Sequence, residues 1–154
     1  VITPLLGRPL EAAAVMVRQG PWEAAAEDAV MSVIRYEGEV IAQIHDAFTV
    51  PHAGTGLEVH GTDGSIVATD VMTQDPVGTV VLRDASGARE IEIPRRPDLY
   101  EVALEAFAGA VEGDGEPTVT GVQGVHALAV ALAVREAALS GRTVPVVTDP
   151  VTAG

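Results

Sequence analysis

The hydrophobic positions change period about two thirds of the way along the chain. Up to residue 93, short segments alternate apolar and polar residues, which is the period-two pattern of β-strands. From residue 98, apolar residues recur every three or four positions, which is typical of amphipathic helices. Strands followed by helices predict an α+β fold, with an open, largely antiparallel (mixed) β-sheet and helices packed on one face.

Residues 40–49 form the clearest of eight predicted strands. Their alternation puts an apolar set of side chains on the core face and places Gln43 and His45 on the other, wetter face. It also places Asp46 on the apolar face, where an ionised carboxylate needs hydrogen-bond partners. For Asp46 a buried structural carboxylate is favoured over a catalytic one. The other strands are expected at 29–36, 57–60, 65–69, 79–83, 89–93 and 144–147, and also at 10–18. Residues 10–18 are apolar throughout: the alanines favour a helix and the run Val-Met-Val at 15–17 favours a strand, so periodicity leaves both open and we take the strand.

Glycine-containing turns separate the shorter strands. The turn over residues 61–64 reads Gly-Thr-Asp-Gly, and its glycines are expected to supply the positive-φ positions of a short hairpin. Residues 85–88 divide the next two strands in the same way. A longer loop over 20–27 carries Trp22, whose ring either stacks on a sugar or, as is commoner, anchors the loop against the core.

Three helical segments are predicted. Residues 1–6 end at a glycine and have the pattern of the last turn of a helix that begins upstream. Asp98 is placed to cap a second helix, which ends before residue 113. Thr120 and Gln123 form the S/T-x-x-E/Q capping box of a third helix that runs to residue 139. The third helix is apolar enough to pack between two layers.

Composition narrows the function classes. The chain has 154 residues, with 22 acidic residues against 9 basic ones, which gives a formal charge of −13. That charge repels phosphate and anionic lipid, so we expect neither nucleic acid nor a membrane as a partner. The chain contains neither lysine nor cysteine, which removes Schiff-base and thiolate chemistry and suits a reducing, cytoplasmic setting. We expect one domain over 1–148 and a loose tail over 149–154.

Seven runs of residues carry a resemblance to a known family. The main ones lie at 27–36, 40–49, 57–66, 98–100 and 116–117, and the third contains the sequence E-V-H-G-T-D-G-S. They look like the carboxyl-terminal domain of the glucose-fructose oxidoreductase and inositol dehydrogenase (Gfo/Idh/MocA) family over nearly the whole chain, and the E-V-H-G-T-D-G-S sequence is characteristic of that domain. Within the family, the stretches at 71–74 and 76–80 look most like anhydroketose reductases.

The resemblance implies a two-domain enzyme. An amino-terminal Rossmann domain of the same protein would hold NADP or NAD, and the present domain would form the substrate-side wall of a sugar pocket and a homodimer or tetramer contact through the sheet face. The family's lysine and histidine both precede the position of Val1, so the resemblance assigns no catalytic or cofactor-binding residue here. The chain alone is expected to be inactive. The alternative is a stand-alone, non-catalytic ligand-binding or scaffold module.

Five residues are candidates for the substrate side or a subunit interface. They are Trp22, Gln43, His45, Asp46 and His60. Gln43 and His45 are expected on a sheet face that borders the sugar pocket, packs on a second subunit or faces solvent. His45 and His60 could meet across one sheet beside Glu58 as an incomplete zinc set, but lone polar residues on such a face are usually satisfied locally, so no metal is expected.

Overall fold

The computed structural model describes residues 2–20, 26–93 and 97–148. The chain folds into two compact units, which are Val1–Pro51 with Val119–Gly154, and His52–Thr118. Each unit contains one four-stranded sheet, and neighbouring strands in the described ranges are antiparallel. The predicted α+β class is confirmed. The strands nevertheless form two sheets in the structure, where a single open sheet was predicted.

The first sheet has the strand order β3-β2-β1-β8. A short 3-10 turn, Glu37–Glu39, joins β2 to β3, and Gly38 adopts φ 73° within it. Ala12 lies opposite Ile34, which in turn lies opposite Ala42, so these three small or branched side chains share one face. The strands span Pro9–Val17 (β1), Ala29–Tyr36 (β2), Val40–Ala47 (β3) and Val144–Pro145 (β8).

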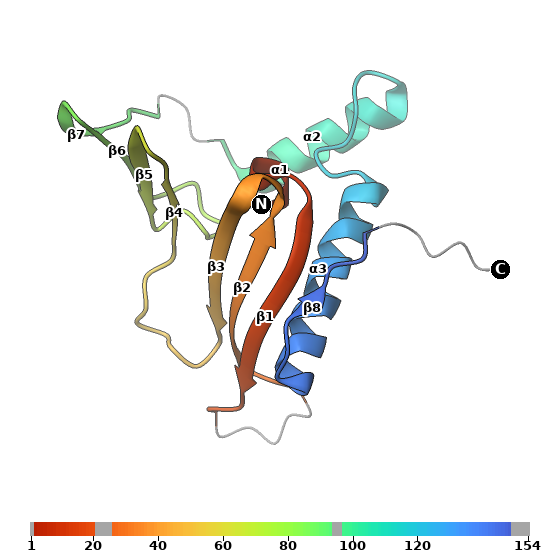
Figure 1. The fold of residues 1–154 in the computed structure, drawn as a ribbon. Coiled ribbons are helices and arrows are strands. Elements are labelled where there is room, and N and C mark those ends of the chain that lie inside the picture. Colours follow the sequence, from red (N-terminus) through yellow and green to blue (C-terminus); the bar gives the residue numbers. More distant parts are fainter. Residues whose placement is uncertain (1, 21–25, 94–96, 149–154) are drawn as a thin grey trace. The chain divides into compact units, whose positions relative to one another are not determined.

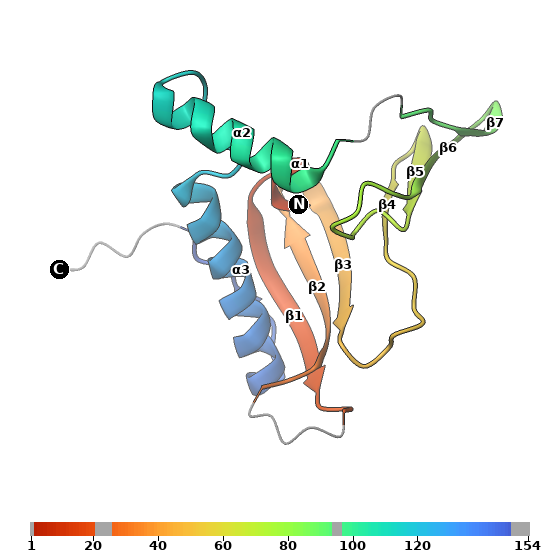
Figure 2. The same cartoon turned by 180° about the vertical axis from the view of Figure 1, so that it is seen from behind.

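Two helices cover that face of the first sheet. The long helix α3 (Gly121–Ser140) runs along β1, as Figures 1 and 2 show from opposite sides. The short helix α1 (Ile2–Leu6) packs Ile2 and Leu6 against the same core. The helices and the strands therefore enclose one apolar cluster on a single side of the sheet. Its buried members are Ala12, Ile34, Tyr36, Ala42, Ala133 and Val146.

Helix α3 begins as the capping box predicts. The Thr120 hydroxyl accepts the Gln123 N–H at 3.3 Å, and Gln123 Oε1 accepts the Thr120 N–H at 2.8 Å. Glycine at position 141, in the left-handed region with φ 66°, ends the helix. Length and composition alone would allow α3 to cross a membrane, although helices of packed domains pass the same test. Here Ala133 and Ala137 are buried on the sheet side.

The second unit is a meander of hairpins with the strand order β4-β5-β6-β7. Helix α2 (Leu99–Glu112) follows it, and the Asp98 carboxylate caps its first turn by accepting the N–H groups of Tyr100 and Glu101. None of the residues of α2 is buried, so its apolar stripe lies exposed. The strands span Gly56–His60 (β4), Gly64–Thr69 (β5), Thr79–Asp84 (β6) and Gly87–Glu90 (β7).

The hairpin turns differ in detail from the prediction. Gly61 and Gly64 do not adopt positive φ. Gly64 is required for another reason, because a Cβ at this position would lie 2.7 Å from the Arg83 carbonyl oxygen on the neighbouring strand. The β6–β7 turn is shorter than predicted, since Asp84 and Gly87 already face each other across the ladder. Strand β7 consequently spans 87–90 where 89–93 was predicted.

Candidate functional site

The face of the first sheet that lies away from α1 and α3 carries two of the predicted site residues. Three rows of side chains cross it, one residue from each of the three long strands. We call this surface the open face. Its rows are Glu11, Arg35 and Ile41; Ala13, Val33 and Gln43; and Val15, Met31 and His45.

The centre of the open face is apolar and exposed. Val15 is 66% exposed, Met31 57% and Ile41 67%. Val15 and Met31 are cross-strand neighbours, and Val33, 46% exposed, is the next residue of β2 on the same face, so these three form a continuous patch. Ile41 lies opposite Arg35 at the end of the face. Gln43 and His45 lie at the β3 edge of this patch, on the wetter face of the strand as predicted.

One ion pair lies across the open face. Arg35 Nε donates to Glu11 Oε1 at 2.9 Å. The hydrogen bond from Arg35 lowers the pKa of Glu11, and the same bond to Glu11 raises the pKa of Arg35. Both groups therefore stay charged at neutral pH, and the face combines an apolar centre with one positive and one negative group at its end.

Asp46 does not occupy the buried position that the alternation predicted. It lies opposite Val30 near the end of β3 and is exposed. The period-two pattern gave the direction of its side chain, but the helices cover only part of that face, so the carboxylate remains in water. Trp22 falls outside the described residues.

His60 lies in a different sheet from His45. On β4 and β5, His60 Nδ1 lies 2.9 Å from Ser65 Oγ, and His60 Nε2 lies 3.1 Å from Glu58 Oε2. Both ring nitrogens thus have local partners, and the pair with Glu58 is more than half exposed. His45 and His60 are therefore not cross-strand neighbours. In the described part of the chain, no three His, Asp or Glu side chains are placed to hold a metal ion.

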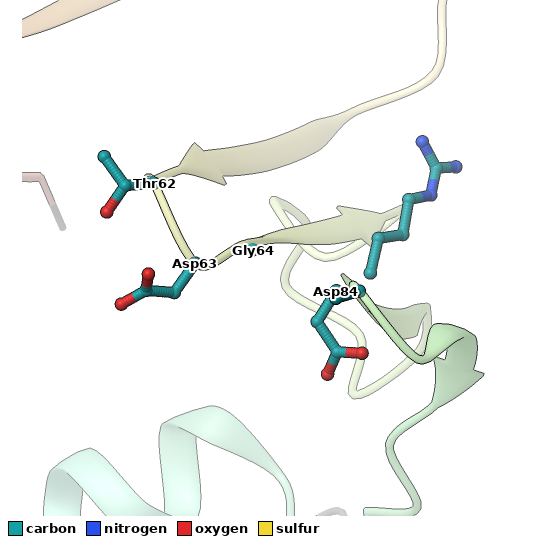
Figure 3. A pocket seen from close by; sticks show the side chains of 7 residues that line it. Thr62, Asp63, Gly64 and Asp84 are labelled. Carbon is teal, nitrogen blue, oxygen red and sulfur yellow. The ribbon is translucent and has the colours of Figure 1, made fainter.

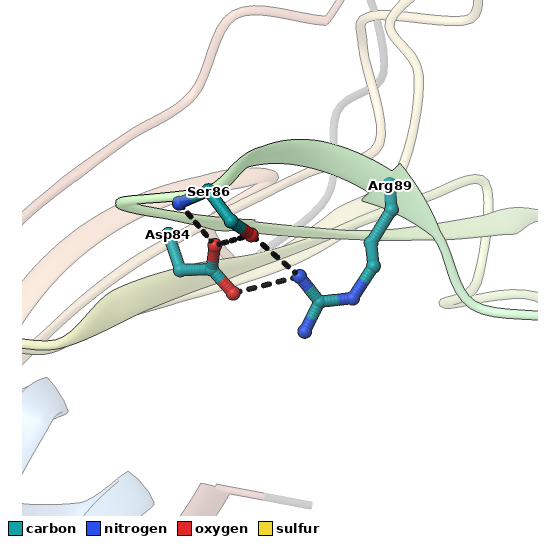
Figure 4. Close-up of polar contacts among 3 residues, drawn as sticks. All are labelled: Asp84, Ser86 and Arg89. Atoms are coloured by element: carbon teal, nitrogen blue, oxygen red, sulfur yellow. Dashed lines mark hydrogen bonds and ion pairs between the residues drawn. The ribbon is translucent and has the colours of Figure 1, made fainter.

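A shallow hollow lies beside the β4–β5 turn. Residues 61–64 and 83–85 line it, and Figure 3 shows the carboxylates of Asp63 and Asp84 at its border. Asp84 is already engaged, since its Oδ1 accepts the N–H and the hydroxyl of Ser86 and its Oδ2 accepts Arg89 Nη1 at 2.7 Å (Figure 4). These bonds stabilise the tight β6–β7 turn. We therefore interpret the hollow as the space between the ends of two hairpins.

The same bonds lower the pKa of Asp84 from 3.8 to about 2, with the Ser86 hydroxyl as the largest cause and Arg89 next. We therefore expect Ser86→Ala to raise this pKa by more than Arg89→Ala does. The stabilisation of the turn is present above the unfolded-state pKa and is lost as the pH falls through about 2. Carboxyl ¹³C titration by NMR measures the pKa of Asp84 in both variants. An equal or smaller rise for Ser86→Ala would show that the hydroxyl does not hold the carboxylate.

The sequence interpretation missed two partners. The Glu11–Arg35 pair depends on the register of β1 against β2, and the intervening loop is too long for its turn type to fix that register. Ser65 had a usable signal: once residues 61–64 are taken as a tight turn, His60 and Ser65 become the first facing pair of the hairpin.

Comparison with known proteins decides the family. Residues 1–146 match the family described as "Oxidoreductase family, C-terminal alpha/beta domain" (GFO_IDH_MocA_C). The chain belongs to this family. A 1,5-anhydro-D-fructose reductase from Ensifer adhaerens is 50% identical to it over 141 residues, which are 91% of this chain and 42% of that protein. The chain thus spans less than half the length of this Gfo/Idh/MocA relative.

Solved structures agree on the Gfo/Idh/MocA fold. An aldose-aldose oxidoreductase from Caulobacter crescentus has a TM-score of 0.80 at 20% identity, over 90% of this chain and 41% of that one. A putative oxidoreductase from Thermotoga maritima gives 0.75 at 21% over the same shares. A levoglucosan dehydrogenase in complex with NADH and levoglucosan gives 0.77 at 19%, over 94% and 46%. At these identities the likeness establishes the α+β fold of the domain.

Proposed function

We propose that this chain is the carboxyl-terminal domain of an NAD(P)-dependent sugar reductase that acts on 1,5-anhydro-D-fructose or a similar anhydroketose. The observation that carries the proposal is the 50% identity to a 1,5-anhydro-D-fructose reductase across 91% of the chain. The domain would supply the substrate-side wall and the subunit contact. Hydride transfer and cofactor binding would belong to an amino-terminal domain, as the 42% coverage of that relative leads us to expect.

The residues of this chain support a structural role. His60 and Asp84 are each held by local hydrogen bonds, and both lie at exposed hairpin ends. Neither is enclosed with other polar groups in the way that a catalytic pair requires. The open face presents exposed apolar side chains from neighbouring strands, and contact with another surface is the role it fits.

A steady-state assay of the complete gene product tests this function. Consumption of NADPH and of NADH is followed with 1,5-anhydro-D-fructose, with D-fructose and with an aldose as separate substrates, each of which offers a carbonyl carbon to the hydride. We expect turnover with the anhydroketose to exceed that with the others by about tenfold or more, because sites that hydrogen-bond a sugar discriminate strongly among its relatives. Equal rates for all three sugars, or no turnover with either nicotinamide, would refute the assignment.

The open face is our proposed subunit interface, and its partner is a second copy of this chain. Within one chain Glu11 and Arg35 already form an ion pair. With a two-fold axis running between β1 and β2, parallel to the strands, Glu11 of one copy would face Arg35 of the other and the apolar centres would meet. Three long strands offer on the order of 800 Å² per copy, the size of a standard stable interface. Gln43 and His45 would then lie at the edge of this interface. We expect His45→Ala to weaken the association of the two copies without raising the KM of the complete protein for its sugar substrate.

A further inference from the structure

The open face carries a single sulfur atom, the thioether of Met31. Met31 lies on the middle strand β2, opposite Val15, and is 57% exposed. The 154 residues contain three methionines and no cysteine, so no thiol of this chain competes with the thioethers for an oxidant. Peroxides oxidise a methionine thioether to the sulfoxide where its sulfur is exposed. Met31 is therefore open to oxidation in a single copy of the chain.

The other two methionines have different surroundings. Met16 follows Val15 on β1, so its side chain points to the helix-covered face of the same sheet, and it is half-buried. Met72 is 46% exposed in the segment between β5 and β6, in the second unit. Met72 thus resembles Met31 in exposure without belonging to the open face, whereas Met16 lies in the same sheet on its covered side.

We propose that Met31 is a site of reversible oxidation by hydrogen peroxide, and that its sulfoxide prevents association through the open face. A lone pair of the sulfur attacks one peroxide oxygen, the O–O bond breaks, and water leaves once a proton has moved to the departing oxygen. The sulfur is oxidised to the sulfoxide and the peroxide is reduced to water. The inference rests on the proposed function in one respect, namely that the open face joins two copies.

Oxidation would place a polar oxygen in the apolar centre of that interface. In a pair of copies packed face to face, the sulfoxide oxygen would leave water beside Val15 and Val33, whose side chains have no hydrogen-bond donor. His45, opposite Met31 on β3, is its one cross-strand neighbour with a donor and lies at the edge of the patch. The pair would therefore bury an acceptor with at most one donor nearby, whereas a single copy leaves the acceptor in water.

Association and oxidation should consequently oppose each other. A second copy on the open face covers the sulfur of Met31, so Met31 should oxidise more slowly in a concentrated, associated sample than in a dilute one. Met72 lies outside the open face and should oxidise at the same rate in both samples. Peptide mass spectrometry, which quantifies the sulfoxide at each methionine, measures the two rates in one sample.

Peroxide treatment of the complete gene product tests the inference. Sedimentation velocity gives the dimer dissociation constant before and after oxidation. We expect the sulfoxide at Met31 to raise this constant about tenfold or more, as burial of an incompletely paired polar group predicts. Treatment with the two methionine sulfoxide reductases, one for each sulfoxide epimer, and a dithiol should restore the original constant.

Two variants assign the effect to one sulfur atom. Met31→Leu keeps nearly the same volume and apolar character, so it should associate as the parent does and lose the response to peroxide. Met72→Leu is the matched control and should keep the full response. A response of equal size in Met31→Leu, or a sulfoxide at Met31 with an unchanged dissociation constant, would overturn the inference and leave the proposed interface standing.

The rate measurements give a second test. Oxidation of Met31 no faster than that of half-buried Met16 in dilute protein would also overturn the inference. Protein that is monomeric before any oxidation would refute the interface and the inference together. None of these readouts depends on catalysis, so inactive protein that still responds to peroxide would count against the proposed reductase activity alone.

Discussion

Ile34→Ala is expected to lower the free energy of unfolding by about 2–5 kcal/mol. Ile34 is 0% exposed and lies between Ala12 and Ala42 on neighbouring strands. Its immediate neighbours are alanines, which cannot extend to refill the space, so the cavity would persist. Urea unfolding followed by far-UV circular dichroism measures the shift in midpoint at unchanged slope.

Val33→Ala is the matched control for this prediction. Val33 is the preceding residue on β2, points to the open face and is 46% exposed. Its truncation removes fewer buried atoms, so its effect should stay below that of Ile34→Ala by at least about 1 kcal/mol. A slip of one residue in the register would exchange the two faces and reverse the order. Equal or reversed losses would therefore contradict the placement of the core.

The strands and helices were predictable because their signals are local. The alternation at 29–36 and 40–49 reproduces β2 and β3 almost to the residue, and the Thr120–Gln123 box fixes the start of α3. The division into two sheets was not predictable in this way. Whether β3 pairs with β4 depends on the path of residues 48–55, and no periodicity encodes that path.

The pattern of apolar and polar residues also did not predict how deeply each side chain is buried. Alternation places Asp46 and Ala42 on the same face of β3, yet Ala42 is buried and Asp46 is exposed because the cover provided by the helices ends between them. Phe107 shows the same effect on α2, where a regular apolar stripe forms a helix without burying any residue. A pattern gives the direction of a side chain, whereas burial depends on which element, or which further domain, lies over it.

If two copies associate through the open face as we propose, Met31→Arg is expected to prevent that association at micromolar concentration. Met31 occupies the middle strand of the open face, between Val15 and His45, so two copies that pack face to face would bring two arginines into the apolar centre. Burying an unpaired charge costs several kcal/mol, which corresponds to at least about a hundredfold rise in the dimer dissociation constant. Sedimentation velocity across a dilution series measures this dissociation constant.

Thr62→Arg, in the exposed β4–β5 turn of the second unit, adds the same charge at a residue that is not part of the open face, and it should leave association unchanged. Both variants change the formal charge of the chain from −13 to −12, which slightly reduces the repulsion between two acidic copies. A loss of association confined to Met31→Arg must therefore be local to the open face. If the Met31→Arg protein still sediments as a dimer, or if Thr62→Arg dissociates equally, the open face is not the subunit interface.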